Sequence, residues 1–191
     1  MFDYAPAPES RSIVDIAPSY GLFIDGEFTD GKDSFKTVNP ASEEVLSEVA
    51  TAGPEDVDRA VAAARRAFGP WSALPGAERA KYLFRIARII QERSRELAVL
   101  ESLDNGKPIR ESRDVDLPLV AAHFFYYAGW ADKLAYAGFG PDPKPLGVAG
   151  QVIPWNFPML MLAWKIAPAL AAGNTVVLKP AETTPLSALF F

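Results

Sequence analysis

The spacing of apolar residues follows a period of two near the amino terminus and a helical period further along the chain. An Asp25-Gly26 turn signal, flanked by short apolar stretches over 22–29, predicts a β-hairpin. Extended stretches over 34–38 and 44–50 follow. The chain therefore begins with β-structure, and the first helix is expected only after residue 53.

Residues 1–20 differ in composition from the rest of the chain. Pro6, Pro8 and Pro18 stand there among small and polar residues. Prolines among small and polar residues at a chain terminus indicate mobility unless the segment docks, so we expect a flexible amino-terminal arm over 1–20. The remaining residues, 21–191, are predicted to form one domain.

Three helices are predicted next from apolar residues at helical spacing. The first begins at Pro54, because proline suits the first helical position, and Gly69-Pro70 is expected to stop it. The second is predicted over 77–103 and the third over 108–132. Basic residues gather on the second helix, where a solvated face explains them better than a binding patch does.

The last part of the chain has the pattern of a βαβ unit. A short apolar stretch over 147–153 is followed by an apolar helix over 159–172 and a β-branched strand over 175–178. Thr184-Pro185 then signals the start of another helix. Strand, helix, strand and helix start indicate an α/β fold with a parallel sheet.

Composition and charge narrow the class of function. The 191 residues are 49% hydrophobic and 23% charged, as in a globular protein of one domain. The net charge of −5 provides no basic face for nucleic acid. No apolar run is long enough to cross a membrane, and the first residues do not resemble a secretory signal, so a cytoplasmic location is expected. With one histidine and no cysteine, the sequence predicts no transition-metal site and offers no thiolate nucleophile.

Two loops follow the predicted parallel strands, at the end of a sheet where α/β proteins bind ligands. In the second loop, Lys179 and Glu182 can straddle a ribose and bond its hydroxyls. The Glu182 carboxylate would repel a 2′-phosphate by roughly 1 to 4 kcal/mol, which favours NAD over NADP. The alternative is an exposed ion pair without a ligand.

The first loop, over 153–158, holds a side-chain amide between two prolines. Asn156 is a suitable donor to a developing oxyanion, although an asparagine that bonds its own loop is the commoner case. Phe157, Met161 and Trp164 are aromatic or apolar residues near this loop. They either line an apolar tunnel or belong to the core.

Taken together and in order, these segments resemble the aldehyde dehydrogenase superfamily, whose members use NAD(P). The resemblance is carried by GVAGQVIPWNFPMLMLAWKIAPALAAGNTVVLKPAETTPL and, upstream, by LFIDGEF, TVNPASEEVL, AFGPWS, ESLDNGKPI and YYAGWADK. It covers residues 21–191, and Lys179 stands 23 positions after Asn156, as in the family. The resemblance implies the amino-terminal part of a Rossmann-like cofactor-binding domain, with an incomplete parallel sheet, flanking helices and an amino-terminal hairpin region.

The resemblance also implies roles for single residues. Asn156 corresponds to the amide of the family's oxyanion hole, and Lys179 and Glu182 correspond to the contacts with the adenosine ribose. The other residues of the two loops are implied to flank the cofactor, and three residues further on to line the aldehyde tunnel: Ile153, Pro154, Trp155, Pro180 and Ala181 for the cofactor, and Phe157, Met161 and Trp164 for the tunnel.

Members of this family oxidise an aldehyde to a carboxylic acid with NAD through a cysteine-bound thiohemiacetal. This sequence contains no cysteine, and the family's cysteine and general-base glutamate correspond to positions after 191. We therefore interpret the chain as an amino-terminal fragment of an aldehyde dehydrogenase that is inactive alone. The alternatives are a non-catalytic module that binds nucleotide or another polypeptide, and an inactive fragment without function.

Residues 134–145 depart from the family pattern. They stand where typical members carry a longer oligomerisation hairpin, and they include Pro141, Pro143 and Pro145. Proline removes the backbone N–H that a strand needs for pairing. The shortened segment weakens the expectation of the homo-oligomer that is usual in the family.

Overall fold

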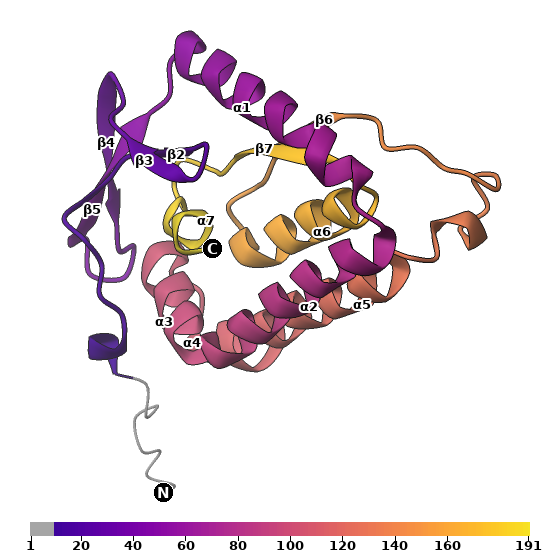
Figure 1. Cartoon of the computed structure of the whole chain (residues 1–191). Helices are drawn as coiled ribbons and strands as arrows, with labels where there is room; N and C mark the ends of the chain where they lie inside the picture. Colours follow the sequence, from indigo (N-terminus) through magenta and orange to yellow (C-terminus); the bar gives the residue numbers. More distant parts are fainter. Residues whose placement is uncertain (1–9) are drawn as a thin grey trace, which may run out of the picture.

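The computed structural model describes residues 10–191, which form a small β-part followed by helices around a two-stranded sheet (Figure 1). In the β-part, β2 and β3 pair antiparallel around Asp25-Gly26, which confirms the predicted hairpin. A separate sheet has the order β1-β5-β4. The strands are β1 (Ser19–Tyr20), β2 (Leu22–Ile24), β3 (Glu27–Thr29), β4 (Asp33–Val38) and β5 (Val45–Thr51).

The predicted arm over 1–20 contains residues that pack against this sheet. Ser19 and Tyr20 pair parallel with β5, and the Ser47 hydroxyl donates to the Ala17 carbonyl over 2.8 Å. The short 3-10 helix η1 (Arg11–Ile13) precedes them. The arm is therefore docked in its second half, because β5 offers unpaired backbone groups that the sequence pattern did not reveal. Residues 1–9 lie outside the described part of the chain.

The first helix, α1 (Pro54–Ala73), continues past the predicted stop at Gly69-Pro70. Its last turn is anchored by Trp71, whose indole N–H donates to the Leu170 carbonyl over 3.2 Å and whose ring packs edge-on against Tyr82. Tertiary contact thus overrides the local signal, and the prediction of a stop at residue 69 was wrong. The helix ends at Ala73, and Leu74 is its C-cap residue.

The helix predicted over 77–103 is two helices, α2 (Gly76–Glu92) and α3 (Ser94–Asn105). Arg93 interrupts them with φ −96° and ψ 12°. Its guanidinium bonds both carboxylate oxygens of Glu96 and the Phe190 carbonyl. The prediction of one continuous helix was wrong because these bonds stabilise a break that the apolar spacing does not record.

The helix predicted over 108–132 also contains an irregularity. It consists of α4 (Ile109–Glu111), the π-helical turn η2 (Ser112–Asp116) and α5 (Leu117–Trp130). Pro118 has no N–H to donate to the carbonyl four residues earlier. The missing hydrogen bond is a physical reason for a π-helical turn just before Pro118.

The carboxyl-terminal elements form the predicted βαβ unit. Strands β6 and β7 are parallel neighbours, which confirms the α/β assignment and the parallel sheet. The connection over 134–145 contains only the short helix η3 (Leu134–Tyr136) and turns. The elements are β6 (Val148–Val152), α6 (Pro158–Ala171), β7 (Thr175–Lys179) and α7 (Leu186–Phe190).

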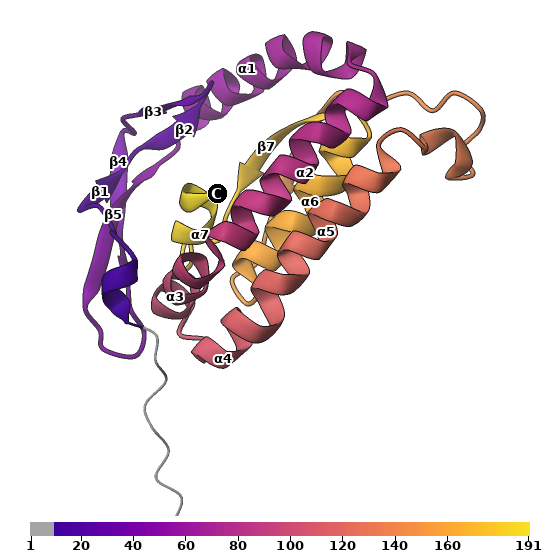
Figure 2. The same ribbon diagram turned by 60° about the horizontal axis from the view of Figure 1, so that its bottom comes forward.

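Helices α1 and α6 cover opposite faces of this small sheet, and Figure 2 shows β7 between them. Successive side chains of β7 point alternately to the two faces of the sheet. The Thr175 hydroxyl donates to the Ala64 carbonyl of α1 over 2.9 Å. Val176 and Leu178 pack instead against the main core, which α2, α5 and α6 supply.

Helix α3 lies between the two parts of the molecule. Its Leu97 and Ala98 belong to the main core, whereas Leu100 packs with Val49 of β5 and Leu186 of α7 in a second, smaller core. One helix therefore joins the β-part to the βαβ unit. Within the described residues, no helix is long and apolar enough to cross a membrane.

The close approach of α2 to the end of α5 generates a prediction for the fold. A Cβ atom added at Gly76 would lie 2.1 Å from the Ala131 carbonyl oxygen, whereas one added at Gly129 would meet open space. We expect Gly76→Ala to lower the free energy of unfolding by about 1–3 kcal/mol. Gly129→Ala, the matched control, should raise it by roughly 0.5–1 kcal/mol because it favours the helix. Urea denaturation measures both, and equal effects of the two substitutions would contradict the close contact.

Candidate functional site

The two predicted ligand loops begin side by side at one edge of the β6–β7 sheet. Val152 and Lys179 are register partners, and the Ile153 N–H donates to the Lys179 carbonyl over 3.1 Å. This edge lies at the carboxyl ends of both strands, where ligands of parallel α/β sheets bind. The expectation that both loops open at the same edge is confirmed.

In the second loop, Lys179 and Glu182 form an exposed ion pair with each other. The hydrogen bond from the Lys179 ammonium is the main cause that lowers the pKa of the Glu182 carboxyl below its ordinary value. Pro180 and Ala181 are half-buried, and the Ala181 carbonyl accepts from the Thr184 N–H over 3.2 Å. The turn thus presents two opposite charges at the strand end, accessible to a polar ligand.

In the first loop, the residues that follow Ile153 are exposed to solvent. Ile153 is 3% exposed, whereas Pro154, Trp155 and Asn156 are exposed, and Trp155 is 62% exposed. The side chain of Asn156 makes no hydrogen bond with another residue of the described range. Its amide is therefore available as a donor, unlike an asparagine that bonds its own loop.

The predicted tunnel residues are Phe157, the N-cap residue of α6, and Met161 and Trp164 within the helix. Their intervals of four and three residues place them in one stripe along one side of α6. Phe157 and Trp164 are 38% and 47% exposed, and Met161 is partly buried against the main core. The Trp164 ring contacts the ring of His123 on α5, with centroids 5.5 Å apart. Trp164 lies about 10 Å along the helix from the loop, so only the start of this stripe adjoins Asn156.

A buried group of charged residues beneath these loops was not predicted from the sequence. Glu101 and Asp104 of α3 and Asp116 of the π-turn are at most 2% exposed. The Lys107 ammonium binds Asp116 and lies 3.6 Å from a Glu101 oxygen. Charges buried this deeply need partners. Lys107 supplies one for Asp116 and lies near Glu101, whereas Asp104 bonds the Thr37 hydroxyl and a backbone N–H of α7.

The two carboxylates of α3 bind the amino ends of the helices that follow the ligand loops. Glu101 Oε2 accepts from the Met159 N–H of α6 over 3.1 Å. Asp104 Oδ2 accepts from the Leu186 N–H of α7 over 2.9 Å, and its other oxygen accepts from the Thr37 hydroxyl over 2.6 Å. The first N–H groups of a helix have no partner within it, so a carboxylate there stabilises the helix start.

Burial raises the pKa of the Glu101 carboxyl to about 7 and that of the Asp104 carboxyl to about 6. The sequence holds a signal for both residues. Glu101 and Asp104 follow Leu97 at intervals of four and three, so the apolar stripe of α3 continues into two acids. Acids on the buried face of a helix indicate capping or chemistry, not a solvated surface.

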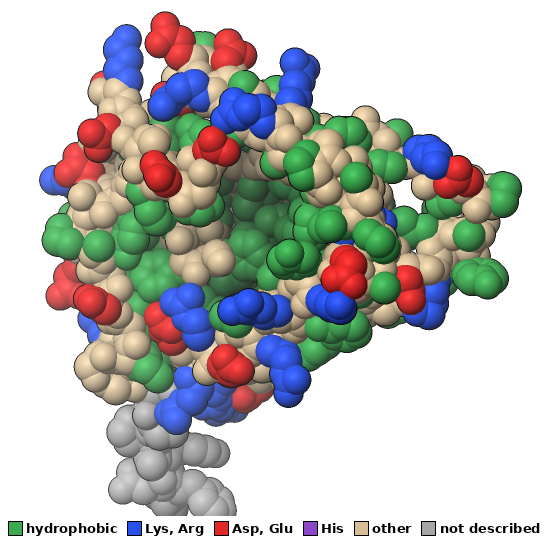
Figure 3. All heavy atoms as spheres, in the orientation of Figure 1, with side chains coloured by type: hydrophobic (Ala, Val, Ile, Leu, Met, Phe, Trp, Pro, Cys, Tyr) green, Lys and Arg blue, Asp and Glu red, His purple; other side chains and the backbone are tan. Residues whose placement is uncertain are grey.

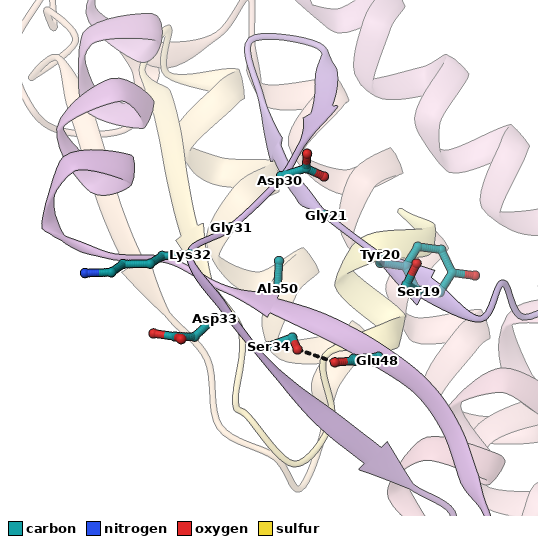
Figure 4. A pocket seen from close by; sticks show the side chains of 10 residues that line it. All are labelled: Ser19, Tyr20, Gly21, Asp30, Gly31, Lys32, Asp33, Ser34, Glu48 and Ala50. Atoms are coloured by element: carbon teal, nitrogen blue, oxygen red, sulfur yellow. Dashed lines mark hydrogen bonds between the residues drawn. The ribbon is translucent and has the colours of Figure 1, made fainter.

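A separate open depression of about 580 Å³ lies in the β-part, at the junction of β1 and β2 with the segment before β4. Figure 4 shows polar residues around it, among them Asp30, Lys32 and Asp33, and the hydrogen bond from Ser34 to Glu48. The predicted ligand residues do not line it. Figure 3 shows a different hollow below α1, in which hydrophobic side chains gather.

Comparison with known proteins matches residues 28–191 to the model of the aldehyde dehydrogenase family. The chain belongs to this family. The matched range includes both loops and the buried charged residues of α3. The resemblance inferred from the sequence motifs is therefore confirmed.

The relatives are much longer than this chain. Benzaldehyde dehydrogenase, mitochondrial, of Antirrhinum majus is 49% identical over 180 residues, which are 88% of this chain and 34% of the relative. Aldehyde dehydrogenase, mitochondrial, of Rattus norvegicus is 48% identical over 88% of this chain and 35% of its own length. The chain thus spans about a third of these curated relatives and matches their amino-terminal part. Because both names include a mitochondrial location, the cytoplasmic location stays a prediction.

A solved structure of similar fold is the NAD⁺ complex of an aldehyde dehydrogenase from Bacillus cereus. It is 45% identical, with a TM-score of 0.84 over 90% of this chain and 38% of that chain. Binding of a nicotinamide dinucleotide therefore occurs within the family. The structural neighbours also confirm the fold class, the amino-terminal portion of an aldehyde dehydrogenase α/β domain.

The raised pKa values generate a prediction about pH. Glu101 keeps its proton in the folded protein up to about pH 7, whereas its ordinary pKa is 4.5. As pH rises between these values, the unfolded chain loses the proton first, so this group's contribution to the free energy of unfolding declines. Relative to wild type, Glu101→Gln should gain up to about 3 kcal/mol between about pH 5 and about pH 8.

Chemical denaturation of both proteins across this pH range measures the difference. Glu78→Gln provides the control, because Glu78 lies on the surface of α2 in a pair with Lys81. A stability difference between Glu101→Gln and wild type that does not change with pH would contradict the assignment.

Proposed function

We propose that this polypeptide supplies part of the coenzyme-binding domain of an oxidoreductase that converts an aldehyde to a carboxylic acid with NAD. The observation that carries the proposal is the pairing of Val152 with Lys179 at one sheet edge. It starts the loop of Asn156 and the loop of Glu182 from adjacent points. One ligand can then meet a charged pair and a free amide together.

The Lys179–Glu182 pair is the proposed ribose contact. Both side chains are more than half exposed, so hydroxyl groups of a ribose can replace part of their mutual bond. Glu182 accepts from a hydroxyl and Lys179 donates to one. Because the carboxyl has a lowered pKa, it is ionised at neutral pH and repels a 2′-phosphate, which supports NAD over NADP.

Asn156 is the proposed donor to the substrate. Its side-chain amide is exposed and not bonded within the described residues, so it can donate to the oxygen of an aldehyde under attack. Ile153, Pro154 and Trp155 are proposed to flank the coenzyme, together with Pro180 and Ala181. The stripe of Phe157, Met161 and Trp164 is the proposed apolar wall for the aldehyde.

NAD, when bound, accepts the hydride that leaves the substrate carbon. The nucleophile that attacks the aldehyde in this family is a cysteine thiolate, and this sequence contains no cysteine. The proposed contribution of this chain is therefore to bind the coenzyme, to orient the aldehyde and to stabilise the oxyanion. The shortened segment over 134–145 still argues against the family's usual oligomer, which remains a prediction.

The missing nucleophile leads to a direct prediction. The purified chain, mixed with NAD and an aliphatic or aromatic aldehyde, should produce no NADH above the uncatalysed rate. Absorbance of the reduced nicotinamide measures this. Turnover that survives repurification of the chain would show that a nucleophile other than cysteine acts here.

The ribose contact is tested by titration calorimetry with NAD and NADP. The wild-type chain should bind NAD more tightly, and Glu182→Gln should reduce the preference by about fivefold or more, because like-charge repulsion of at least about 1 kcal/mol is removed. Glu78→Gln is the matched control, since Glu78 and Lys81 form an exposed pair with the same spacing on α2. An unchanged preference in Glu182→Gln would refute the ribose assignment.

A further inference from the structure

Asn156 must be held in place to act as a donor, yet its own side chain has no partner within the described residues. The place of an exposed loop side chain depends first on the backbone that carries it, so restraints on the neighbouring residues limit where its amide can lie. The neighbours of Asn156 are restrained, and three of the restraints come from one short segment, residues 101–107.

Three contacts connect this segment to the loop. The Asn105 side-chain amide donates to the Trp155 carbonyl over 2.5 Å. The Lys107 ammonium lies 4.0 Å from the centre of the Phe157 ring, a cation–π contact. The Glu101 carboxyl accepts from the N–H two residues after Phe157 over 3.1 Å. Each of residues 155, 157 and 159 is thus held by one of these contacts, and Asn156 lies between the first two.

The turn after α3 makes this arrangement possible. Gly106 has φ +80°, and a Cβ atom there would lie 2.5 Å from Pro40, so only glycine fits. The reversal at Gly106 returns Lys107 toward Glu101, where the two groups are 3.6 Å apart. Asp116 then binds the same ammonium from the π-turn. Lys107, only 11% exposed in its side chain, is therefore fixed from two sides beneath Phe157.

From these contacts we propose that Glu101, Asn105 and Lys107 are positioning residues that set the orientation of the Asn156 amide. They are not among the proposed ligand contacts and act through Trp155, Phe157 and the start of α6. The inference rests on the proposed function, because the orientation of Asn156 matters for catalysis only if Asn156 is the donor. The restraint itself can be measured without coenzyme.

The test is NMR relaxation of the whole 191-residue chain. In wild type, the backbone amides of Trp155, Asn156 and Phe157 should have order parameters near about 0.85. Asn105→Ala and Phe157→Leu each remove one contact at the surface and should lower the Asn156 value toward about 0.6. The amides of β6 and β7 should not change. Phe157→Tyr retains the ring and should behave as wild type.

Two further variants separate positioning from general stability. Lys107→Met removes the cation and should mobilise Asn156, and Lys107→Arg should restore order. Asp104→Asn alters the neighbouring buried acid, which caps α7 and not α6. It should shift the Leu186 amide and leave Asn156 unaffected, even if it lowers the melting temperature as much as Lys107→Met does. Should Lys107→Met fail to fold, Asn105→Ala and Phe157→Leu still decide.

The inference is overturned if the Asn156 amide is already disordered in wild type, or if Asn105→Ala and Phe157→Leu leave it unchanged. These outcomes differ from failure of the proposed function. Absence of NAD binding in calorimetry, with an ordered Asn156 that responds to the variants, would reject the function and retain the restraint. Normal NAD binding, with an Asn156 order parameter that does not change in any variant, would retain the proposed function and reject the restraint.

Discussion

Helices α6 and α7 each start directly after a ligand loop, and carboxylates from one buried turn of α3 bind the N–H groups at both starts. A buried N–H without a partner destabilises a fold by about 1–3 kcal/mol, so these two bonds restrict where each helix can begin. The beginning of the helix in turn determines where its loop ends. The geometry of the candidate site therefore depends on Glu101 and Asp104, although neither belongs to the proposed ligand contacts.

The buried carboxyl groups near α3 also constrain the charge of this region. Glu101 and Asp116 share a single buried cation, Lys107, which leaves an excess of negative charge unless a carboxyl keeps its proton. Burial raises the pKa of the Glu101 carboxyl, and the negative charge of Asp116 adds to the effect, so Glu101 is the carboxyl that keeps its proton. The same helix carries Leu97 in the main core and Leu100 in the smaller one, so polar capping and apolar packing are combined in a single element. Movement of α3 would disturb both cores and both loops together.

Several features of the fold follow from local patterns in the chain. The hairpin around Asp25-Gly26, the βαβ unit and the shared edge of the two loops were all predicted, because turn chemistry, β-branched strands and crossover handedness are local or general rules. The order of motifs identified the family. The errors at Gly69-Pro70 and Arg93 have one origin: bonds from Trp71 to α6 and from Arg93 to α7 connect residues about a hundred positions apart, and no local pattern contains them.

The sequence by itself determined the residue types at the candidate site: a lysine and a glutamate after one strand, an asparagine after the other, and no cysteine anywhere in the chain. Only the tertiary structure decided that the Asn156 side chain has no partner among residues 10–191, that the loop around it is held by Asn105 and Lys107, and that the acids of α3 are buried caps. The physical reason is that a hydrogen bond or a cation–π contact requires atoms within a few ångströms. Spacing along a chain sets which groups are present, and folding alone sets which of them meet.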